Sequence, residues 1–137
     1  MKASKPSFRI ILFAAVFFFA SCTKDQDFSS TTREIISEGQ WSVDYYYAGQ
    51  DKTTLFSHFQ FVFQGNGVVK GSNGSVSIEG SWNMIRDVNR NDVIRITINS
   101  PEPHFSDLTE SWNVTEKNSS VVAMKDAQNH ELRFRKL

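Results

Sequence analysis

The sequence predicts an all-β fold, in which eight short antiparallel strands close into an up-and-down barrel behind a short helical turn. Apolar and polar residues alternate with a period of two in most segments after Gly39, which is typical of half-buried strands. Tight-turn sequences separate these segments at short, regular spacing. Eight strands joined in chain order can close without leaving exposed edges. A β-sandwich is the alternative, and it is less favoured because no long crossover connection is evident.

The first half of the predicted barrel holds one helical turn and four strands. Residues 29–38 combine a Ser/Thr cap, acidic residues and an Ile pair, which predicts a helical turn before Gly39. Gly-Asn-Gly and Ser-Asn-Gly turns, at 64–67 and 71–74, favour tight hairpins because Asn and Gly accept positive φ. Gly80 is expected to make a bulge or bend in the fourth strand. The four strands are expected at 41–47, 55–63, 68–70 and 76–84.

The second half holds four more strands. Ile residues alternate with polar residues from Ile94 to Ile98, which predicts a strand with one buried face. Pro101 and Pro103 end it, because proline cannot donate a hydrogen bond to a strand ladder. Polar turns separate the remaining segments. The strands are expected at 94–99, 108–114, 121–124 and 132–134.

The N-terminus is predicted to be a lipoprotein signal peptide over residues 1–21. Its first nine residues carry three basic residues and no acid, and an apolar run over 10–20 follows. The run is shorter than the roughly 20 residues that a membrane span needs, and it has the length of a signal-peptide core. Phe19-Ala20-Ser21-Cys22 resembles the lipobox of bacterial lipoproteins, which implies lipid on the Cys22 thiol and an outer-membrane location in the cell envelope. An ordinary secretory signal is the alternative.

The mature chain is expected to be one slightly acidic domain. Residues 22–37 would form the lipidated N-terminus and a tether, and residues 38–137 the barrel. Residues 23–27 either resemble the surface-export signals of Bacteroidota-type lipoproteins or are simply a charged tether. The chain has 15 basic and 15 acidic residues, and three of the basic ones lie in the signal peptide. Nucleic acid is therefore not expected as a partner, because its binding needs clustered Lys and Arg.

The motif Gly39-Gln40-Trp41, opening the first strand after a helical turn, resembles the Gly-x-Trp signature of the lipocalin or calycin group. Together with the lipobox, a Phe-x-Phe-x-Phe strand and the second motif Gly80-Ser81-Trp82, it is similar to the small lipocalin-like lipoproteins of Bacteroidota. The resemblance implies that Trp41 plugs one end of the barrel. It also implies that an arginine near the last strand, Arg133 or Arg135, packs across that indole.

The inward faces of the predicted barrel carry the candidate ligand-binding residues. A period of two points Glu110 inward, as a polar anchor for a ligand or a partner of Arg133. A wet rim position, or a bulge near residues 106–107, is the favoured alternative for Glu110. On the outer face, Tyr46, Phe56 and Val62 would form an apolar patch. The candidates for the ligand site or barrel interior are Tyr45, Tyr47, Phe61, Trp82, Glu110 and Trp112.

The sequence offers little chemistry for catalysis. His58, His104 and His130 are widely separated and lack the spacing of a metal site, and Gly-x-Ser-x-Gly is absent. Neither an enzyme nor a cofactor is expected. The expected function is a non-catalytic, envelope-anchored barrel that binds a small apolar ligand. The alternative is a packed interaction module, either an inhibitor or an accessory subunit of an envelope protein complex.

Overall fold

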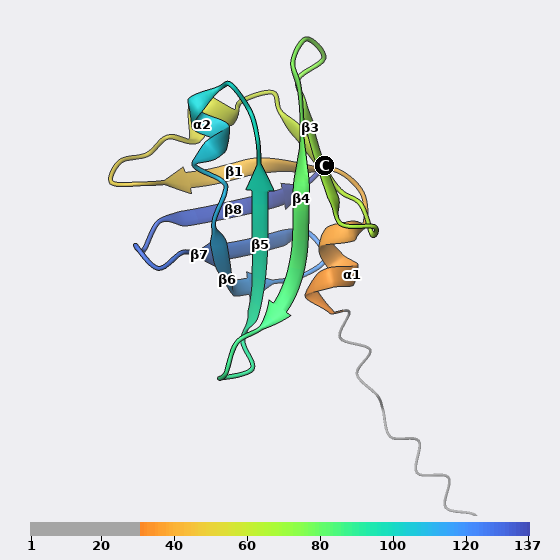
Figure 1. Cartoon of the computed structure of the whole chain (residues 1–137), viewed down its shortest axis with the longest axis vertical. Helices are drawn as coiled ribbons and strands as arrows, with labels where there is room; N and C mark the ends of the chain where they lie inside the picture. Colours follow the sequence, from red (N-terminus) through yellow and green to blue (C-terminus); the bar gives the residue numbers. More distant parts are fainter. Residues whose placement is uncertain (1–30) are drawn as a thin grey trace, which may run out of the picture.

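A computed structural model describes residues 31–137, so the predicted signal peptide and Cys22 lie outside the described residues. Eight antiparallel strands form a closed barrel in chain order, and β8 pairs back with β1 (Figure 1). This confirms the predicted up-and-down barrel over the sandwich. The strands are β1 (Trp41–Tyr47), β2 (Gln60–Phe63), β3 (Val68–Ser72), β4 (Ser77–Arg86), β5 (Asp92–Ile98), β6 (Ser111–Lys117), β7 (Val121–Lys125) and β8 (Glu131–Lys136).

The predicted helical turn is helix α1 (Thr32–Ser37). Its N-terminus carries a capping box, in which the Thr31 hydroxyl accepts from the Glu34 N–H and the Glu34 carboxylate accepts from the Thr31 N–H. Ile36 is fully buried in the barrel core, and its carbonyl accepts the Trp41 indole N–H at 3.0 Å. The helix therefore belongs to the folded domain, whereas residues 22–37 were predicted to form the lipidated N-terminus and tether.

A bulge in β1 reverses the predicted orientations of Tyr45 and Tyr46. Val43 pairs with Phe134 and Tyr45 pairs with Arg133, so Asp44 is an extra residue in the strand. The extra residue shifts the period-two pattern by one position. Tyr46 is consequently buried and Tyr45 half-buried, the reverse of the prediction.

The predicted strand over 55–63 is shorter than expected. Residues Thr53–Phe56 form the 3-10 helix η1, and only Gln60–Phe63 pair as β2. The Phe56 ring is buried edge-on against Tyr46, with the ring centroids 5.3 Å apart. The predicted outer apolar patch of Tyr46, Phe56 and Val62 therefore does not exist, since two of its three members are in the core.

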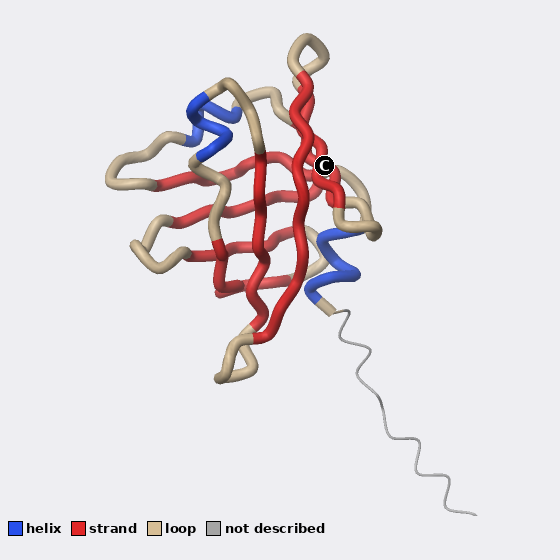
Figure 2. Tube along the Cα trace, in the orientation of Figure 1, coloured by secondary structure: helices blue, strands red, loops and turns tan. Residues whose placement is uncertain are grey.

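The β5–β6 connection contains a short helix, α2 (Pro103–Ser106), where the sequence predicted only a loop. Pro103 stands in the first turn of this helix, where its missing N–H is no loss. Phe105 is fully buried and Leu108 reaches the core from the loop before β6. Figure 2 shows α2 and η1 together at one end of the barrel.

Gly80 makes no bulge, because the pairing of β4 with both neighbours is regular through it. A side chain there would collide with the Thr97 carbonyl oxygen of β5. The glycine therefore allows β4 and β5 to approach each other closely at this position.

The barrel interior is filled by side chains, ten of which are aromatic. Eight-stranded barrels are just wide enough for side chains to pack across them. Each of the three indole N–H groups, from Trp41, Trp82 and Trp112, donates a hydrogen bond to a backbone carbonyl. Burying these polar atoms in the core therefore leaves no indole donor unsatisfied. The buried aromatic residues are Trp41, Tyr46, Phe56, Phe59, Phe61, Phe63, Trp82, Phe105, Trp112 and Phe134.

Candidate functional site

The two ends of the barrel differ in their covering. We call the end with α1 and the β2–β3, β4–β5 and β6–β7 turns the helix rim. We call the opposite end, with η1, α2 and the β3–β4 and β7–β8 turns, the loop rim (Figures 1 and 2). Polar side chains gather in cavities at both rims.

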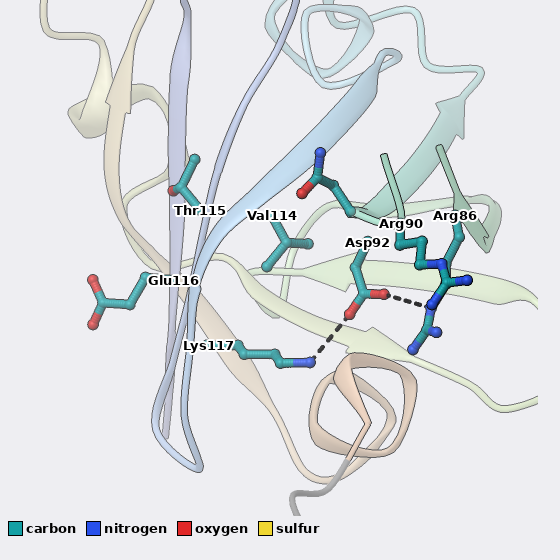
Figure 3. A pocket seen from close by; sticks show the side chains of 8 residues that line it. Arg86, Arg90, Asp92, Val114, Thr115, Glu116 and Lys117 are labelled. Atoms are coloured by element: carbon teal, nitrogen blue, oxygen red, sulfur yellow. Dashed lines mark hydrogen bonds and ion pairs between the residues drawn. The ribbon is translucent and has the colours of Figure 1, made fainter. Parts of the chain in front are cut away.

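At the helix rim, Asp92 joins three elements to β5 (Figure 3). Its carboxylate accepts a hydrogen bond from the Thr32 hydroxyl of α1. It also pairs with Lys117 Nζ at 3.1 Å and Arg86 Nε at 3.3 Å, from the ends of β6 and β4. Burial alone would raise the pKa of Asp92, but the hydrogen bonds from Thr32 and Lys117 and the nearby cations outweigh burial and lower it.

Two shallow cavities flank this carboxylate. Arg86 and Asp92 line both, and together the cavities bring three arginines and a lysine to one end of the barrel. Arg33 is fixed there by a hydrogen bond to the Gly65 carbonyl at 2.9 Å and by its guanidinium 5.1 Å from the centre of the Trp82 ring. The first cavity, of about 330 Å³, is lined by Arg86, Arg90, Asn91, Asp92, Val114, Thr115, Glu116 and Lys117, and the second, of about 280 Å³, by Thr31, Thr32, Arg33, Met84, Ile85, Arg86 and Asp92.

At the loop rim, a cavity of about 280 Å³ opens beside the buried Tyr46 ring, and we call it the Tyr46 cleft. Lys52 Nζ lies 3.9 Å from an Asp107 carboxylate oxygen at its edge. Burial, with smaller contributions from Asp107, Asp126 and Glu110, raises the pKa of Tyr46 to about 12. The cleft is lined by Tyr46, Ala48, Lys52, Ser106, Asp107, Glu110 and His130.

Asp126 is the buried charged residue behind this cleft. Its Oδ1 accepts the backbone N–H groups of Gln128 and His130, which fixes the β7–β8 turn. Its Oδ2 has no aligned hydrogen-bond donor among residues 31–137, and it lies 2.7 Å from His130 Nδ1. The contact is an ion pair when the imidazole is protonated. This residue was not predicted as a site residue, although the spacing of Asp126 and His130 across a polar turn is present in the sequence.

The structure separates the predicted ligand residues. Phe61, Trp82 and Trp112 are buried in the packed core. Tyr47 is 39% exposed and Tyr45 faces outward, with the Arg133 guanidinium 5.7 Å from its ring centre. An interior position for these two tyrosines was wrong, because the Asp44 bulge turns them away from the core.

Glu110 is exposed and lines the Tyr46 cleft, so it occupies the rim position that was its favoured alternative. The strand β6 begins only at Ser111, after the loop that follows α2. The period of two that pointed Glu110 inward therefore does not extend to this residue.

The cation beside Trp41 is a lysine, not one of the two predicted arginines. Lys136 Nζ lies 5.9 Å from the centre of the Trp41 ring. Arg133 and Arg135 instead bind the bulged Asp44, with Nε to carboxylate distances of 2.8 and 3.0 Å. Gly39, at φ +82°, leaves room for Lys136, since a Cβ there would lie 2.8 Å from its Cε. The signature residues Gly39 and Trp41 thus both lie against Lys136, a different cation from the one predicted.

Comparison with solved structures finds one protein with a similar fold. The crystal structure of a DUF4847 family protein from Bacteroides vulgatus ATCC 8482 matches the barrel. The match has a TM-score of 0.53 and 20% sequence identity, and it covers 77% of this chain and 96% of that chain. No family model matches this chain, and no curated protein does. At this sequence identity, the likeness shows a shared fold and no more.

The described residues hold neither a metal cluster nor a spanning helix. Within residues 31–137, no group of three or more His, Cys, Asp or Glu side chains could hold a metal ion. No helix in that part of the chain is long and apolar enough to cross a membrane.

Proposed function

We propose that this chain is a lipoprotein of the cell envelope, anchored to the outer membrane through Cys22, whose packed barrel is a non-catalytic interaction module. The lipobox-like Phe19-Ala20-Ser21-Cys22 supports the anchor. The observation that supports the module is the interior of the barrel, where residues such as Phe61, Trp112 and Phe134 are fully buried against one another. Contacts with other molecules then fall to the rims and the outer surface.

The second candidate function is binding of a small apolar ligand, which the type of fold suggests. Ligand pockets of barrels are enclosed, mostly apolar and about 300–1,000 Å³ in volume. The cavities described above are open at the rims and lined largely by charged and polar side chains. An apolar ligand would therefore require the aromatic core to rearrange, which close packing opposes.

Native mass spectrometry of the processed lipoprotein, extracted from its own envelope in detergent, separates the two functions. A packed module is expected to give the mass of the lipidated chain, alone or with a protein partner. A small molecule bound at one-to-one stoichiometry would favour the ligand-binding barrel instead.

The Phe61→Ala variant provides a positive control for a cavity. It removes a fully buried ring, and cavities made this way in apolar cores stay dry and bind small apolar molecules. The variant is expected to bind benzene while the unaltered chain does not. Binding of benzene by both chains would contradict a filled interior.

The anchor is tested by Cys22→Ser. Without the thiol, the chain is expected to accumulate unprocessed or in soluble form. A Cys22→Ser chain that is still processed and still extracted only by detergent would refute lipidation at this residue. The matched control is Ser21→Ala, which keeps a small residue before the cysteine.

A further inference from the structure

The β4–β5 turn is the most exposed apolar feature of the helix rim. Val88, at its tip, is 97% exposed, and Ile85 before it is 36% exposed. The turn projects from the same end of the barrel as α1 (Figure 1). The fold does not bury the Val88 side chain, so only contact with another molecule could remove it from water.

Two arginines flank this valine. The Arg86 side chain is 69% exposed, and Arg90 is exposed and makes no side-chain hydrogen bond or ion pair within residues 31–137. Lys117 is exposed and lines the same cavity, with its Nζ 3.1 Å from Asp92 (Figure 3). The arrangement is an apolar tip between two exposed guanidinium groups. Arg86 pairs with Asp92 through Nε, whereas the Arg90 guanidinium has no partner within residues 31–137. Guanidinium groups of this kind can bind phosphate oxygens.

The carboxylates of this turn are already engaged within the fold. Asp87 Oδ1 accepts the backbone N–H groups of Asn89 and Asn91, each at 2.8 Å. Asp92 is held by Thr32, Lys117 and Arg86, as described above. Glu116 is exposed on the far side of the cavity, from β6. Two of the three acidic groups near the tip are therefore already engaged by hydrogen bonds or ion pairs, whereas the Arg90 guanidinium makes neither within residues 31–137.

With lipid on Cys22, as proposed above, the length of chain before α1 would keep this rim close to the membrane. From Cys22 to Thr31, the first described residue, there are nine residue steps. Even fully extended, nine residues span at most about 30 Å. A short tether gives its two ends an effective concentration in the millimolar range, so that a weak contact suffices to orient the domain.

We propose that the β4–β5 turn rests on the phospholipid surface, with Val88 in the interfacial region and Arg86 and Arg90 on lipid phosphate groups. This proposal rests on the lipid anchor at Cys22. It turns the helix rim toward the membrane and the loop rim, with the Tyr46 cleft, toward the surrounding compartment. A protein partner on the same turn is the competing occupant.

A single fluorescent label tests the contact in the full lipidated chain. Cys22 is the only cysteine of the sequence and its thiol would carry lipid, so Val88→Cys provides the one free thiol. The chain, labelled with an environment-sensitive nitrobenzoxadiazole group, is placed in vesicles of phosphatidylethanolamine and phosphatidylglycerol mixed in equal parts. Its matched control is Ser75→Cys, at the exposed β3–β4 turn of the loop rim.

The label at position 88 is expected to shift to the blue and to be quenched by nitroxide-labelled lipids. The label at position 75 is expected to do neither. Equal signals from both positions would overturn the proposal. If the chain floats with the vesicles while position 88 stays in water, the orientation fails and the anchor stands. If the chain does not float, the anchor itself fails, and the orientation fails with it.

Removing the two arginines tests their part in the contact. Each basic residue near an anionic bilayer contributes about fivefold to binding. Arg86→Gln together with Arg90→Asn should therefore lower the ratio of docked to undocked label by about 25-fold. Asparagine is chosen at position 90 because it tolerates the local φ of +66°.

The charge-matched control is Lys70→Gln together with Lys125→Gln, on β3 and β7 away from the turn. Thermal unfolding of both double variants checks that the fold is intact. If the control pair lowers docking as much as the arginine pair does, the contact is a general charge effect and the proposed role of Arg86 and Arg90 is wrong.

Discussion

Arg135 binds Asp44 with two nitrogens, Nε at 3.0 Å from one carboxylate oxygen and Nη2 at 2.9 Å from the other. Arg133 Nε reaches the same carboxylate at 2.8 Å. Asp44 is the extra residue of the β1 bulge, and both arginines lie on β8, its pairing partner. The ion pair therefore forms at the point where the bulge turns Tyr46 into the core. The hydrogen bond and charge of Arg135, with a smaller contribution from Arg133, lower the pKa of Asp44.

Asp44→Asn is expected to lower the free energy of unfolding by about 0.5–1 kcal/mol, the usual size for exposed ion pairs. The loss should shrink at high salt, because screening weakens the original pair. Urea unfolding at low and high ionic strength measures both effects. Asp51→Asn, in a loop aspartate without an ion pair among the described residues, is the control. A loss that is independent of salt would mean that the bulge depends on shape alone.

Asp92→Asn tests the joint between α1 and the barrel. The variant removes the charge that pairs with Lys117 and Arg86, and should lower the free energy of unfolding by about 1.5–3 kcal/mol at neutral pH. Because the folded-state pKa of Asp92 is lowered, its stabilisation is present above the unfolded pKa of about 4 and is lost as pH falls through the folded value. Urea unfolding of both chains from neutral pH to acid should show the difference closing below about pH 4.

Two substitutions separate the role of the Thr32 hydroxyl from that of its methyl group. Thr32 is fully buried, so Thr32→Val removes the hydroxyl at nearly constant volume, and Thr32→Ser keeps it. Valine should destabilise the fold more than serine does. The reverse order would show that the methyl group, and not the hydrogen bond to Asp92, matters at this position.

Tyr46→Phe tests the buried phenol beside the cleft. The folded-state pKa of Tyr46 is raised to about 12, so the protonated phenol contributes stability that is fully present below the unfolded pKa of about 10. That stability is lost as pH rises from about 10 toward about 12. Tyr46→Phe should behave like the original chain at neutral pH and lose less stability across this alkaline range.

The alkaline series is followed by urea unfolding, with Tyr47→Phe as the control because the Tyr47 side chain is 39% exposed. The comparison cancels the titration of lysines, which all three chains share. Identical alkaline profiles for the original chain and Tyr46→Phe would contradict a buried, protonated phenol.

Trp41→Ala is expected to cost about 3–5 kcal/mol, as other truncations of large core side chains do. Lys136→Met, which keeps the aliphatic stem beside the indole and removes the cation, should cost at most about 1 kcal/mol. Urea unfolding compares the two. A loss below about 1 kcal/mol for Trp41→Ala would mean that the ring is not a structural plug.

The architecture could be predicted because alternation and turn chemistry act over a few residues. The Gly65-Asn66-Gly67 turn and the Ile94, Ile96, Ile98 face required no information from elsewhere in the chain. The bulge at Asp44 could not be predicted in this way, because it depends on arginines about 90 residues away. A one-residue bulge then reversed the expected faces of Tyr45 and Tyr46.

The parts of the site that escaped prediction share this dependence on distant contacts. Phe56 is in the core because Phe105 of α2 packs against it, with the ring centroids 5.8 Å apart. Nothing near Asp92 in the sequence indicates Thr32, which is 60 residues away. The choice of Lys136 over an arginine beside Trp41 follows from the register of β8 against β1, which the resemblance to lipocalins did not specify.

The pairing of β1 with β8 also determines when the fold can be completed. Trp41 pairs with Lys136, and the Leu137 N–H donates to the Gln40 carbonyl at 2.9 Å. An emerging or translocating chain therefore exposes the edges of β1 and β7 until β8 is available to pair with them, and unpaired edges are sites of aggregation. Long-range closure of this kind is slow relative to local hairpins. Nonsense mutations or proteolysis that remove β8 would leave the remaining seven strands as an open sheet.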